Sequence, residues 1–443
     1  MLTQTKKIIR DLGDGLILRH ASPADGEALA EFNGRIHGED AEDGRRVATW
    51  TRDLLTRPHS TLKPDDFTIV EETSSGRIVS SLNLIPQIWS YEGIEFGVGR
   101  PELVGTLSEY RGKGLVRAQF DVVHQWCVER GLIVQSITGI PTFYRQFGYE
   151  FALNLGGCRF GFQVPKLKDG ENEKFQVRPA EGNDIPFMMS IYEHECRRNM
   201  VSTNWTEAHW HNNLYEMSRD NLQRREFRVI ERADTHEPVG YLVHASHLGM
   251  TGANMFQYEI QPGISWLEVT PSVVRYLWEV GQEYAKVENK TCTTFGFVLG
   301  AQHPSYEVMG DGLPHVHAPY AWYLRVPDLI GFLHRIKPVL EKRLAESVVC
   351  GHSGEFLIGM YPKGIKLTLE HGRITGIEPW KPDHADHGNA GFPALTFLQI
   401  LFGYRSFDEL KFAFPDCWWD NYGTRAVINS LFPKKHSNVY GIV

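Results

Sequence analysis

The residues best suited to chemistry lie in one stretch, between positions 104 and 149. It contains Arg111-Gly112-Lys113-Gly114, which separates a short strand-like run from an apolar run of helical periodicity. Two glycines at such a junction permit positive φ angles and let another molecule approach the backbone closely. Free N–H groups at a helix start bind anions, and the helix dipole strengthens the binding. Because Arg111, Lys113 and Arg117 add positive charge, the pattern predicts a pyrophosphate site.

Two familiar nucleotide-binding motifs do not fit this stretch. It matches neither GxxxxGK[ST] nor GxGxxG, so it is neither a P-loop nor a dinucleotide-binding turn. An ordinary strand-to-helix turn is the alternative, and a lone G-x-G would favour it. The choice between the two depends on the surrounding residues.

Alternating strands and helices must position these residues. The stretch itself predicts a strand at 104–107, a helix that Gly131 ends, a strand at 132–140 and a short helix after Pro141. Upstream, a strand at 16–19 precedes a helix that Ser22 caps and Pro23 opens. Further strands are predicted at 67–71, 77–86 and within 151–164. This order predicts an α/β (α+β) domain.

Three motifs in this region resemble those of the GNAT acyltransferases. Arg111-x-x-Gly114-x-Val116 is similar to the family's acetyl-CoA signature, [Q/R]-x-x-G-x-[G/A]. The preceding Val104-Gly105-Thr106 matches the strand whose bulged backbone binds the pantetheine arm. Phe143-Tyr144-x-x-x-Gly148-Tyr149 matches the segment in which a tyrosine serves as general acid. Val116, in place of a small residue, and Ser108, where proline is common, depart from the pattern.

The resemblance implies a cofactor, a mechanism and a set of site residues. Acetyl-CoA would be the co-substrate, and a neutral primary amine would attack its thioester directly in a ternary complex. Tyr144 would reprotonate the CoA thiolate, and a core tyrosine that holds the short helix is the alternative role. Backbone N–H groups at the bulge would polarise the thioester carbonyl. The residues expected to bind the cofactor are Val104, Gly105, Thr106, Arg111, Gly112, Lys113, Gly114, Leu115, Val116 and Arg117.

After position 174 the chain starts a second, similar unit. Val177-Arg178-Pro179-Ala180-x-x-x-Asp184 repeats the pattern of Leu18-Arg19-His20-Ala21-x-x-x-Asp25. Strands at 227–232, 239–245 and 291–299, a helix at 271–287 and Tyr306-x-x-x-Gly310 follow in the matching order. Because no Arg-x-x-Gly-x-Gly occurs between 269 and 280, we expect a GNAT fold without cofactor binding. An unrelated α/β domain is the alternative.

The last part of the chain has a different order of predicted helices and strands. It predicts a helix at 329–344, strands at 356–360, 364–370 and 373–378, and helices at 394–402, from 406 and at 424–432. This order is similar to a sterol-carrier-protein-like domain, and its place after two GNAT folds resembles the Eis (enhanced intracellular survival) acetyltransferases. The predicted domains are an acetyl-CoA-binding GNAT domain at 1–165, a degenerate GNAT domain at 174–325 and a sterol-carrier-protein-like α+β domain at 326–443.

The apolar tail is a further candidate. In Eis-like enzymes the terminal carboxylate enters the active site as a base, and here that carboxylate belongs to Val443. The family's last residue is often aromatic, so Val443 departs from it, and an idle, frayed end is the alternative. Glu39, Asp40, Glu42 and Asp43 either line the amine side of the cleft or form an exposed loop.

The composition argues against several other classes of protein. Six scattered cysteines without a CxxC motif fit a reducing cytosol rather than a disulfide framework or a zinc knuckle. We expect no metal, because His384 and His387 stand in a loop without further ligands. The sequence has no apolar segment of membrane-spanning length, no signal-peptide pattern and no basic cluster for nucleic acid. We therefore expect a cytoplasmic protein.

Three functions are open at this point. The favoured one is an N-acetyltransferase for a small-molecule or peptide amine, and the resemblance implies a homo-oligomer. The net charge of −8 suits a cationic acceptor only weakly, since it also serves solubility. The alternatives are a lipid or apolar-ligand binding protein, acting through the C-terminal domain, and a non-catalytic acyl-CoA-binding protein.

Overall fold

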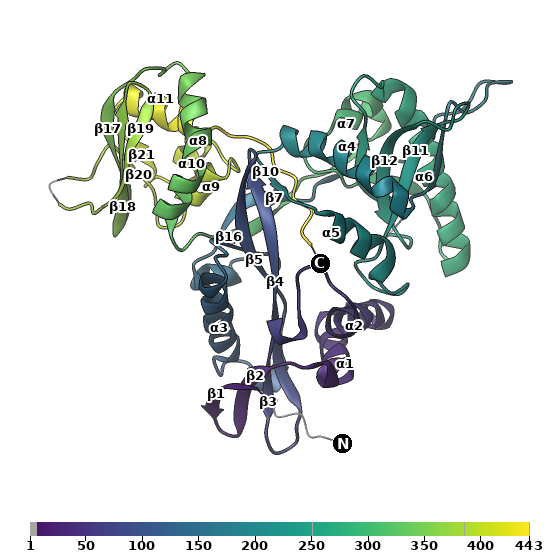
Figure 1. Cartoon of the computed structure of the whole chain (residues 1–443), viewed down its shortest axis with the longest axis horizontal. Helices are drawn as coiled ribbons and strands as arrows, with labels where there is room; N and C mark the ends of the chain where they lie inside the picture. Colours follow the sequence, from purple (N-terminus) through teal and green to yellow (C-terminus); the bar gives the residue numbers. More distant parts are fainter. Residues whose placement is uncertain (1–6, 250, 385, 443) are drawn as a thin grey trace.

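The chain forms three lobes around three β-sheets. The structure is a computed structural model that describes residues 7–249, 251–384 and 386–442. The N-terminal lobe lies at one end, and the second and third lobes lie on opposite sides of the upper part of its sheet (Figure 1). Each lobe combines helices with a sheet, as the predicted α/β (α+β) class requires.

The first sheet is mixed and has the strand order β1-β2-β3-β4-β5-β6-β16-β7, with β10 also paired to β4. Its strands are β1 (Ile8–Gly13), β2 (Leu16–His20), β3 (Phe67–Glu72), β4 (Ile78–Tyr91), β5 (Ile94–Thr106), β6 (Val134–Ile137), β7 (Glu150–Leu155), β10 (Val201–Thr203) and β16 (Tyr320–Arg325). β5 and β6 run parallel, whereas the other pairs run antiparallel.

Helices cover both faces of this sheet. They are η1 (Pro23–Asp25), α1 (Gly26–His37), α2 (Ala41–Thr56), η2 (Pro64–Asp66), η3 (Ser108–Tyr110), α3 (Leu115–Glu129) and η4 (Phe143–Phe147). α3 buries Phe120, Val123 and Cys127, a spacing that places them on one helix face. Figure 1 shows α3 on one side of the sheet and α1 and α2 on the other.

The second sheet has the order β15-β8-β14-β13-β12-β11-β9, in which β13 and β14 run parallel. Its strands are β8 (Cys158–Gly161), β9 (Phe175–Pro179), β11 (Arg225–Arg232), β12 (Pro238–Ala245), β13 (Gly252–Ile260), β14 (Thr294–Phe297) and β15 (His315–His317). Its helices are η5 (Gly182–Asp184), α4 (Ile185–Arg198), α5 (Glu207–His211), the π-helix η6 (Asn212–Glu216), α6 (Trp266–Glu288), α7 (Pro304–Met309) and η7 (Gly310–Gly312).

The third sheet has the order β19-β18-β17-β20-β21. Its strands are β17 (Gly354–Met360), β18 (Lys363–Glu370), β19 (Arg373–Trp380), β20 (Ala390–Gly391) and β21 (Trp418–Trp419). The lobe also contains α8 (Leu329–Ala345), α9 (Phe397–Leu401), α10 (Phe407–Ala413) and α11 (Tyr422–Leu431). Its core continues into the first sheet, because Phe332 and Phe397 belong to the same buried cluster as Trp89 and Trp322.

Three strands cross between the first and second lobes, and the first is β10, which follows α4 in sequence but pairs with β4 of the first sheet. β16, from residues that follow the second sheet in sequence, lies between β6 and β7 of the first sheet. β8, which directly follows β7 in sequence, instead pairs with β14 and β15 of the second sheet. The expected ranges 1–165 and 174–325 therefore each contain a strand that completes the other sheet.

The sequence repeat corresponds to a repeated cluster of charges. Arg19 on β2 bonds both Asp25 and Glu71, with its Nη2 at 2.6 Å from Asp25 Oδ1. At the matching place in the second lobe, Arg178 on β9 bonds Asp184 and Glu231. In both lobes the arginine joins its own strand to the turn before the next helix and to a neighbouring strand.

Several elements differ from the expectation. α2 occupies residues for which no helix was predicted, and Asp40 caps it by accepting from the N–H groups of Glu42 and Asp43. α6 begins at Trp266, so Pro271 lies inside it rather than opening it. α9 covers 397–401, which is shorter than the predicted 394–402. Within the described residues, no helix is both long and apolar enough to cross a membrane.

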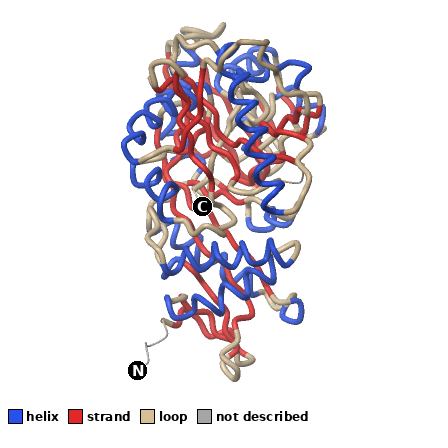
Figure 2. Tube along the Cα trace, turned by 90° about the vertical axis from the view of Figure 1, so that its right-hand side faces the viewer, coloured by secondary structure: helices blue, strands red, loops and turns tan. Residues whose placement is uncertain are grey.

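The chain end returns to the middle of the molecule. Figures 1 and 2 both place it near the junction of the lobes, far from the N-terminal sheet edge. It follows β10 there, since the Met200 N–H donates to the His436 carbonyl at 2.8 Å. The Val201 N–H donates to Ser437 Oγ at 3.1 Å. This course carries the tail from the third lobe to the first sheet.

Candidate active site

The glycine turn before α3 has the geometry of an anion site. Gly112 and Gly114 both adopt the left-handed conformation, with φ of 78° and 75°. A Cβ at either position would meet no atom within 4 Å, so the space above the turn is open. Among the described residues, the N–H groups of residues 112–117 have no hydrogen-bond partner. The start of α3 thus presents unsatisfied donors to an exposed surface.

Three cations surround this turn. Arg111 donates weakly to the Thr106 carbonyl at 3.4 Å, and Lys113 Nζ lies 5.4 Å from the Tyr110 ring centroid. Arg117 donates to Gln146 Oε1 at 2.8 Å, and its guanidinium lies over the Phe147 ring. None of the three forms an ion pair within the described chain. Their charge is therefore available to an anionic ligand.

The strand that leads to this turn separates from its parallel neighbour. β5 and β6 are paired only at Val98–Val134 and Gly99–Gln135, although β5 continues to Thr106. β5 also carries an irregularity opposite β4, where Leu103 adopts a φ of 51°. The irregularity lies between the paired residues Glu102 and Gly105, so it overlaps the expected bulge at Val104. Beyond these two pairs the strands diverge, which leaves a gap between their backbones.

Tyr144 lies at this gap. It belongs to η4 and is only 5% exposed, with its ring against Phe120 and Tyr323. A Cβ on Gly139, just after β6, would lie 3.5 Å from the Tyr144 hydroxyl. In the described part of the chain this hydroxyl makes no hydrogen bond. Burial, and then the charge of Glu102, raise the pKa of Tyr144 above its ordinary value, so the phenol stays protonated.

The chain end is fixed on the other side of the gap. The Ile442 carbonyl accepts from Gln87 Nε2 and from Arg100 Nη1, each at 2.9 Å. Arg100 in turn pairs with Glu102 at 2.5 Å. The Trp205 indole donates to the Tyr440 carbonyl at 3.3 Å. Val443, the expected base, lies outside the described residues.

A cavity of about 330 Å³ adjoins this chain end. Arg100 and Thr138 border it from the first sheet, where β5 and β6 diverge, and residues 438–442 form another wall. The second sheet contributes Arg225 and Phe227. The cavity therefore lies between two lobes and the tail, next to the gap that Tyr144 borders.

The second lobe has no counterpart of the glycine turn. α6 follows Ser265, and its only nearby glycine of positive φ is Gly263. Tyr306, which corresponds in sequence to Tyr144, is engaged through its hydroxyl with the carbonyls of Phe297 and Gly300. Because two backbone carbonyls hold the Tyr306 hydroxyl, we assign Tyr306 a structural role rather than that of a general acid.

The four acidic residues after α1 do not reach the cavity. Glu39, Asp40, Glu42 and Asp43 lie at the start of α2, where Asp40 is the helix cap. None of them lines this cavity, and Glu42 instead pairs with Lys290 of the second lobe at 3.8 Å. Among the described residues, no group of three or more His, Cys, Asp or Glu side chains could hold a metal ion.

Sequence analysis missed several residues that the fold brings to the site. Arg100 and Glu102 are the charges within the otherwise apolar run 96–104 of β5, and that contrast was a usable signal. Trp205 and Arg225 come from the second lobe, and no local pattern marks them. They reach the site only because the two lobes pack together.

Comparisons with known proteins agree with this geometry. Residues 37–152 match the family model described as an acetyltransferase (GNAT) domain. That range includes the glycine turn, the gap between β5 and β6 and Tyr144. The chain therefore contains a GNAT acetyltransferase domain, the domain of enzymes that transfer acyl groups from CoA thioesters. No curated protein matches the chain.

Solved structures match over nearly the whole length. A GCN5-related N-acetyltransferase from Kribbella flavida is 16% identical with a TM-score of 0.61, covering 97% of this chain and 98% of that one. One from Anabaena variabilis is 12% identical with a TM-score of 0.63, covering 96% and 99%. Eis1 from Mycobacterium abscessus is 13% identical with a TM-score of 0.55, covering 95% and 99%. These matches confirm the predicted fold class of GNAT-like folds with mixed sheets and a C-terminal α+β part.

Proposed function

We propose that the protein transfers an acetyl group from acetyl-CoA to a primary amine by direct attack in a ternary complex. The observation that carries this proposal is the glycine turn at residues 112–114, with its free N–H groups and unpaired cations. The turn would hold the pyrophosphate, and the pantetheine arm would follow β5 toward the gap beside β6. The residues proposed to bind the cofactor are those expected from the sequence, namely residues 104–106 and 111–117.

Tyr144 and the chain end would handle the protons. Tyr144 is proposed to reprotonate the CoA thiolate, which its raised pKa and unbonded hydroxyl support. The Val443 carboxylate is proposed to take the proton of the amine. The support is the buried Ile442, whose carbonyl is held by Arg100 and Gln87 one residue before the end. Amine and thioester would meet between these two groups.

The domain assignment forms part of the proposal. The repeated Arg–Asp–Glu cluster supports two tandem GNAT domains, at 1–165 and 174–325, that exchange strands. The order of helix α8, strands β17 to β19 and helices α9 to α11 supports a sterol-carrier-protein-like domain at 326–443. An Eis-type enzyme of this kind would act in the cytoplasm as a homo-oligomer. The free cysteines support a reducing compartment.

Thermal unfolding with acetyl-CoA tests the cofactor site. We expect acetyl-CoA to raise the Tm, because a ligand that binds only the folded state stabilises it. Gly114→Asp should abolish the shift, since its carboxylate would repel the pyrophosphate and its side chain would fill the open space above the turn. Gly131→Asp is the matched control. It also has a positive φ and open surroundings, but it lies at the far end of α3.

The comparison of the two variants decides the result. Gly131→Asp should lower the Tm of the free protein about as much as Gly114→Asp, yet keep the acetyl-CoA shift. An unchanged shift in Gly114→Asp would show that the cofactor binds elsewhere.

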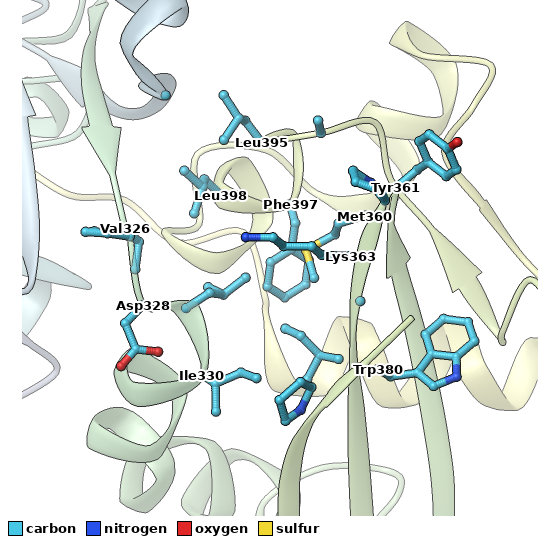
Figure 3. Close-up of a pocket in the computed structure, with 18 of the residues that line it drawn as sticks. Val326, Asp328, Ile330, Met360, Tyr361, Lys363, Trp380, Leu395, Phe397 and Leu398 are labelled. Atoms are coloured by element: carbon cyan, nitrogen blue, oxygen red, sulfur yellow. The ribbon is translucent and has the colours of Figure 1, made fainter. Parts of the chain in front are cut away.

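A second function is supported by a separate cavity of about 680 Å³ at the junction of α8 and the third sheet. Its walls are largely apolar, with Ile330, Phe397 and Leu398 among the residues that line it (Figure 3). Lys363 extends across it in the same view. The combination suits an apolar ligand with an anionic end, such as a fatty acid, as the alternative lipid-binding function requires.

Titration with a fluorescent fatty acid tests this alternative. We expect saturable binding that Leu398→Trp abolishes by filling the cavity, whereas the acetyl-CoA shift stays unchanged. Lys363→Gln should weaken binding of the acid but not of the corresponding alcohol. Binding that survives Leu398→Trp would exclude this cavity as the lipid site.

A further inference from the structure

The cavity between the two lobes and the tail has an unusual charge balance for a site that accepts an amine. Two arginines line it, Arg100 and Arg225, and among the described residues no aspartate or glutamate does. A cavity selected for polycationic amines would carry acidic side chains, because opposite charges attract across a site that excludes water. The charge of this cavity therefore indicates an acceptor with an anionic part.

Arg100 is already engaged with protein groups. Its Nη1 holds the Ile442 carbonyl and its Nη2 pairs with Glu102. Its guanidinium also lies 5.2 Å from the Trp322 ring centroid. Arg100 therefore fixes the tail and has little capacity left for a ligand.

Arg225 is the available cation. Its Nη1 donates to the carbonyls of Leu222 and Arg224, at 3.1 and 3.0 Å, and its guanidinium lies 4.4 Å from the Phe256 ring centroid. Within the described chain, Nε and Nη2 have no hydrogen-bond partner and no acid pairs with the side chain. Burial lowers the pKa of Arg225 to about 10, and within the described residues no carboxylate compensates its charge.

Alternation along the second sheet places a further polar group beside Arg225. Arg225 and Phe227 are two residues apart on β11, so they face the same side. Phe227 pairs with Val243, and Val243 pairs with Gln257, so these side chains form one row across the sheet. Gln257 is 3% exposed, and its Oε1 has no hydrogen-bond partner in the described structure. This row faces the cavity with one cation, one unsatisfied amide and apolar surface.

Several aromatic side chains also line the cavity. Trp205, Phe227, Phe256 and Trp322 contribute to its walls. Aromatic walls favour an acceptor with an apolar side group. The Arg225 guanidinium has two nitrogens without a partner in the described chain, and these match the two oxygens of a carboxylate. The first-sheet end, at Arg100 and Thr138, lies where β5 and β6 diverge toward Tyr144.

We propose that the acceptor is an amine that also carries a carboxylate and an apolar side group, as a free amino acid does, and that its carboxylate binds Arg225. The amine then points toward the gap between β5 and β6, and the side group packs on the aromatic walls. This inference rests on the proposed transfer function, and it names the substrate class of that same site.

Acceptor pairs that differ only in the carboxylate test the inference. The rate of CoA release is measured with L-phenylalanine and L-leucine, with the amides of both, and with spermidine as a polycation. We expect kcat/KM to favour each acid over its amide by about 10- to 100-fold, the range for one charge-assisted hydrogen-bonded pair. Spermidine should be a poorer acceptor than either acid.

Two arginine variants test whether Arg225 causes the preference for acids over amides. Arg225→Gln should remove the preference while changing kcat/KM for the amides by less than about 3-fold, because the amides make no charge-assisted bond there. Arg224→Gln is the matched control, since Arg224 bonds Glu226 and does not line the cavity. This variant should keep the preference of the unmodified protein.

A binding measurement separates this inference from the transfer proposal. Trp205 and Trp322 line the cavity, so L-phenylalanine should change the tryptophan emission of the full chain, and Arg225→Gln should abolish the change. If no amine is acetylated but this Arg225-dependent change is present, the transfer proposal is wrong. The inference that the cavity binds a free amino acid through Arg225 is then still supported. If amides and acids are acetylated equally, or neither acid changes the emission, the acceptor class is overturned.

Discussion

Tyr144 is a buried phenol whose hydroxyl has no hydrogen-bond partner in the described structure. Tyr149, its neighbour in the motif, differs because its hydroxyl bonds His124 Nε2 at 2.9 Å. Tyr306, its counterpart in the second lobe, is held by backbone carbonyls. Of these three tyrosines, only Tyr144 combines the gap in the sheet with a free hydroxyl. That difference supports the assignment of the acid role to Tyr144.

Tyr144→Phe is expected to lower kcat by about 10²–10⁴-fold and to leave the acetyl-CoA Kd nearly unchanged, because the hydroxyl acts only as the thiolate leaves. The pKa of Tyr144 is raised above 10.0, and the protonated form is the acid, so raising the pH to 9.5 should not remove its contribution. Steady-state rates from pH 6 to 9.5 check both points. Near-normal turnover by Tyr144→Phe would show that another group supplies the proton.

At the residue scale, sequence alone could indicate the proposed cofactor residues but not the proposed acceptor residues. The glycine turn and Tyr144 lie within one continuous stretch, so their spacing carries the information. Arg225 is separated from Arg100 by 125 positions, and only the packing of two sheets brings both to one cavity. The net charge of −8 even suggested a cationic acceptor, whereas the cavity itself carries positive charge.

At the element scale, local pattern predicted the strands and helices with continuous apolar periodicity. α3 and its flanking strands were predicted because Gly114 and Gly131 mark the two helix ends. α2 was missed although Val47, Trp50 and Leu54 lie on one helix face, because the charged residues before them suggested a loop. Pro271 suggested a helix start, but α6 extends one turn further and buries Val269 and Thr270 against its sheet.

The tail is the element on which the proposed base depends. Adding one residue after Val443 should keep the contacts of Ile442 but displace the carboxylate, whereas deleting Ile442 and Val443 removes both. If the carboxylate takes the proton of the amine, both changes should lower kcat. The loss should grow at low pH, where more amine arrives protonated.

Ile442→Leu is the control, since it keeps the carbonyl that Arg100 and Gln87 hold as well as the free carboxylate. Its turnover should stay near that of the unmodified chain. If the deletion lowers turnover but the extension does not, the tail acts as an anchor and its carboxylate has no part in the reaction.

At the scale of the whole molecule, the first sheet cannot be completed from the first 165 residues. β6 and β7 do not pair with each other, because β16 lies between them. No local pattern indicates this, since a strand at 320–325 has the same apolar character whichever sheet it joins. The sequence therefore predicted the order of elements but not the exchange of strands.

A fragment of residues 1–165 is expected to aggregate, because β6 and β7 would expose unpaired edges. Tyr320 pairs with Leu155 in an antiparallel ladder, so residues 319–326 can follow Leu155 through a short glycine turn. That fused fragment should be more soluble, with a cooperative unfolding transition by circular dichroism.

The same fusion with Tyr323 and Leu324 replaced by lysine is the control, since both side chains are fully buried in the native sheet. A monomeric, cooperatively folded 1–165 fragment would show that β16 is dispensable for the first sheet.

The position of the tail has a consequence for synthesis of the protein on the ribosome. Residues 438–442 form a wall of the cavity, and they are made after both sheets that the cavity adjoins. Chains that stop before residue 438, through a nonsense codon or stalled translation, would carry the complete glycine turn and Tyr144, yet would lack this wall. Under the proposed function, such chains should bind acetyl-CoA but should not position an amine. The proposed transfer would then require translation through residue 442.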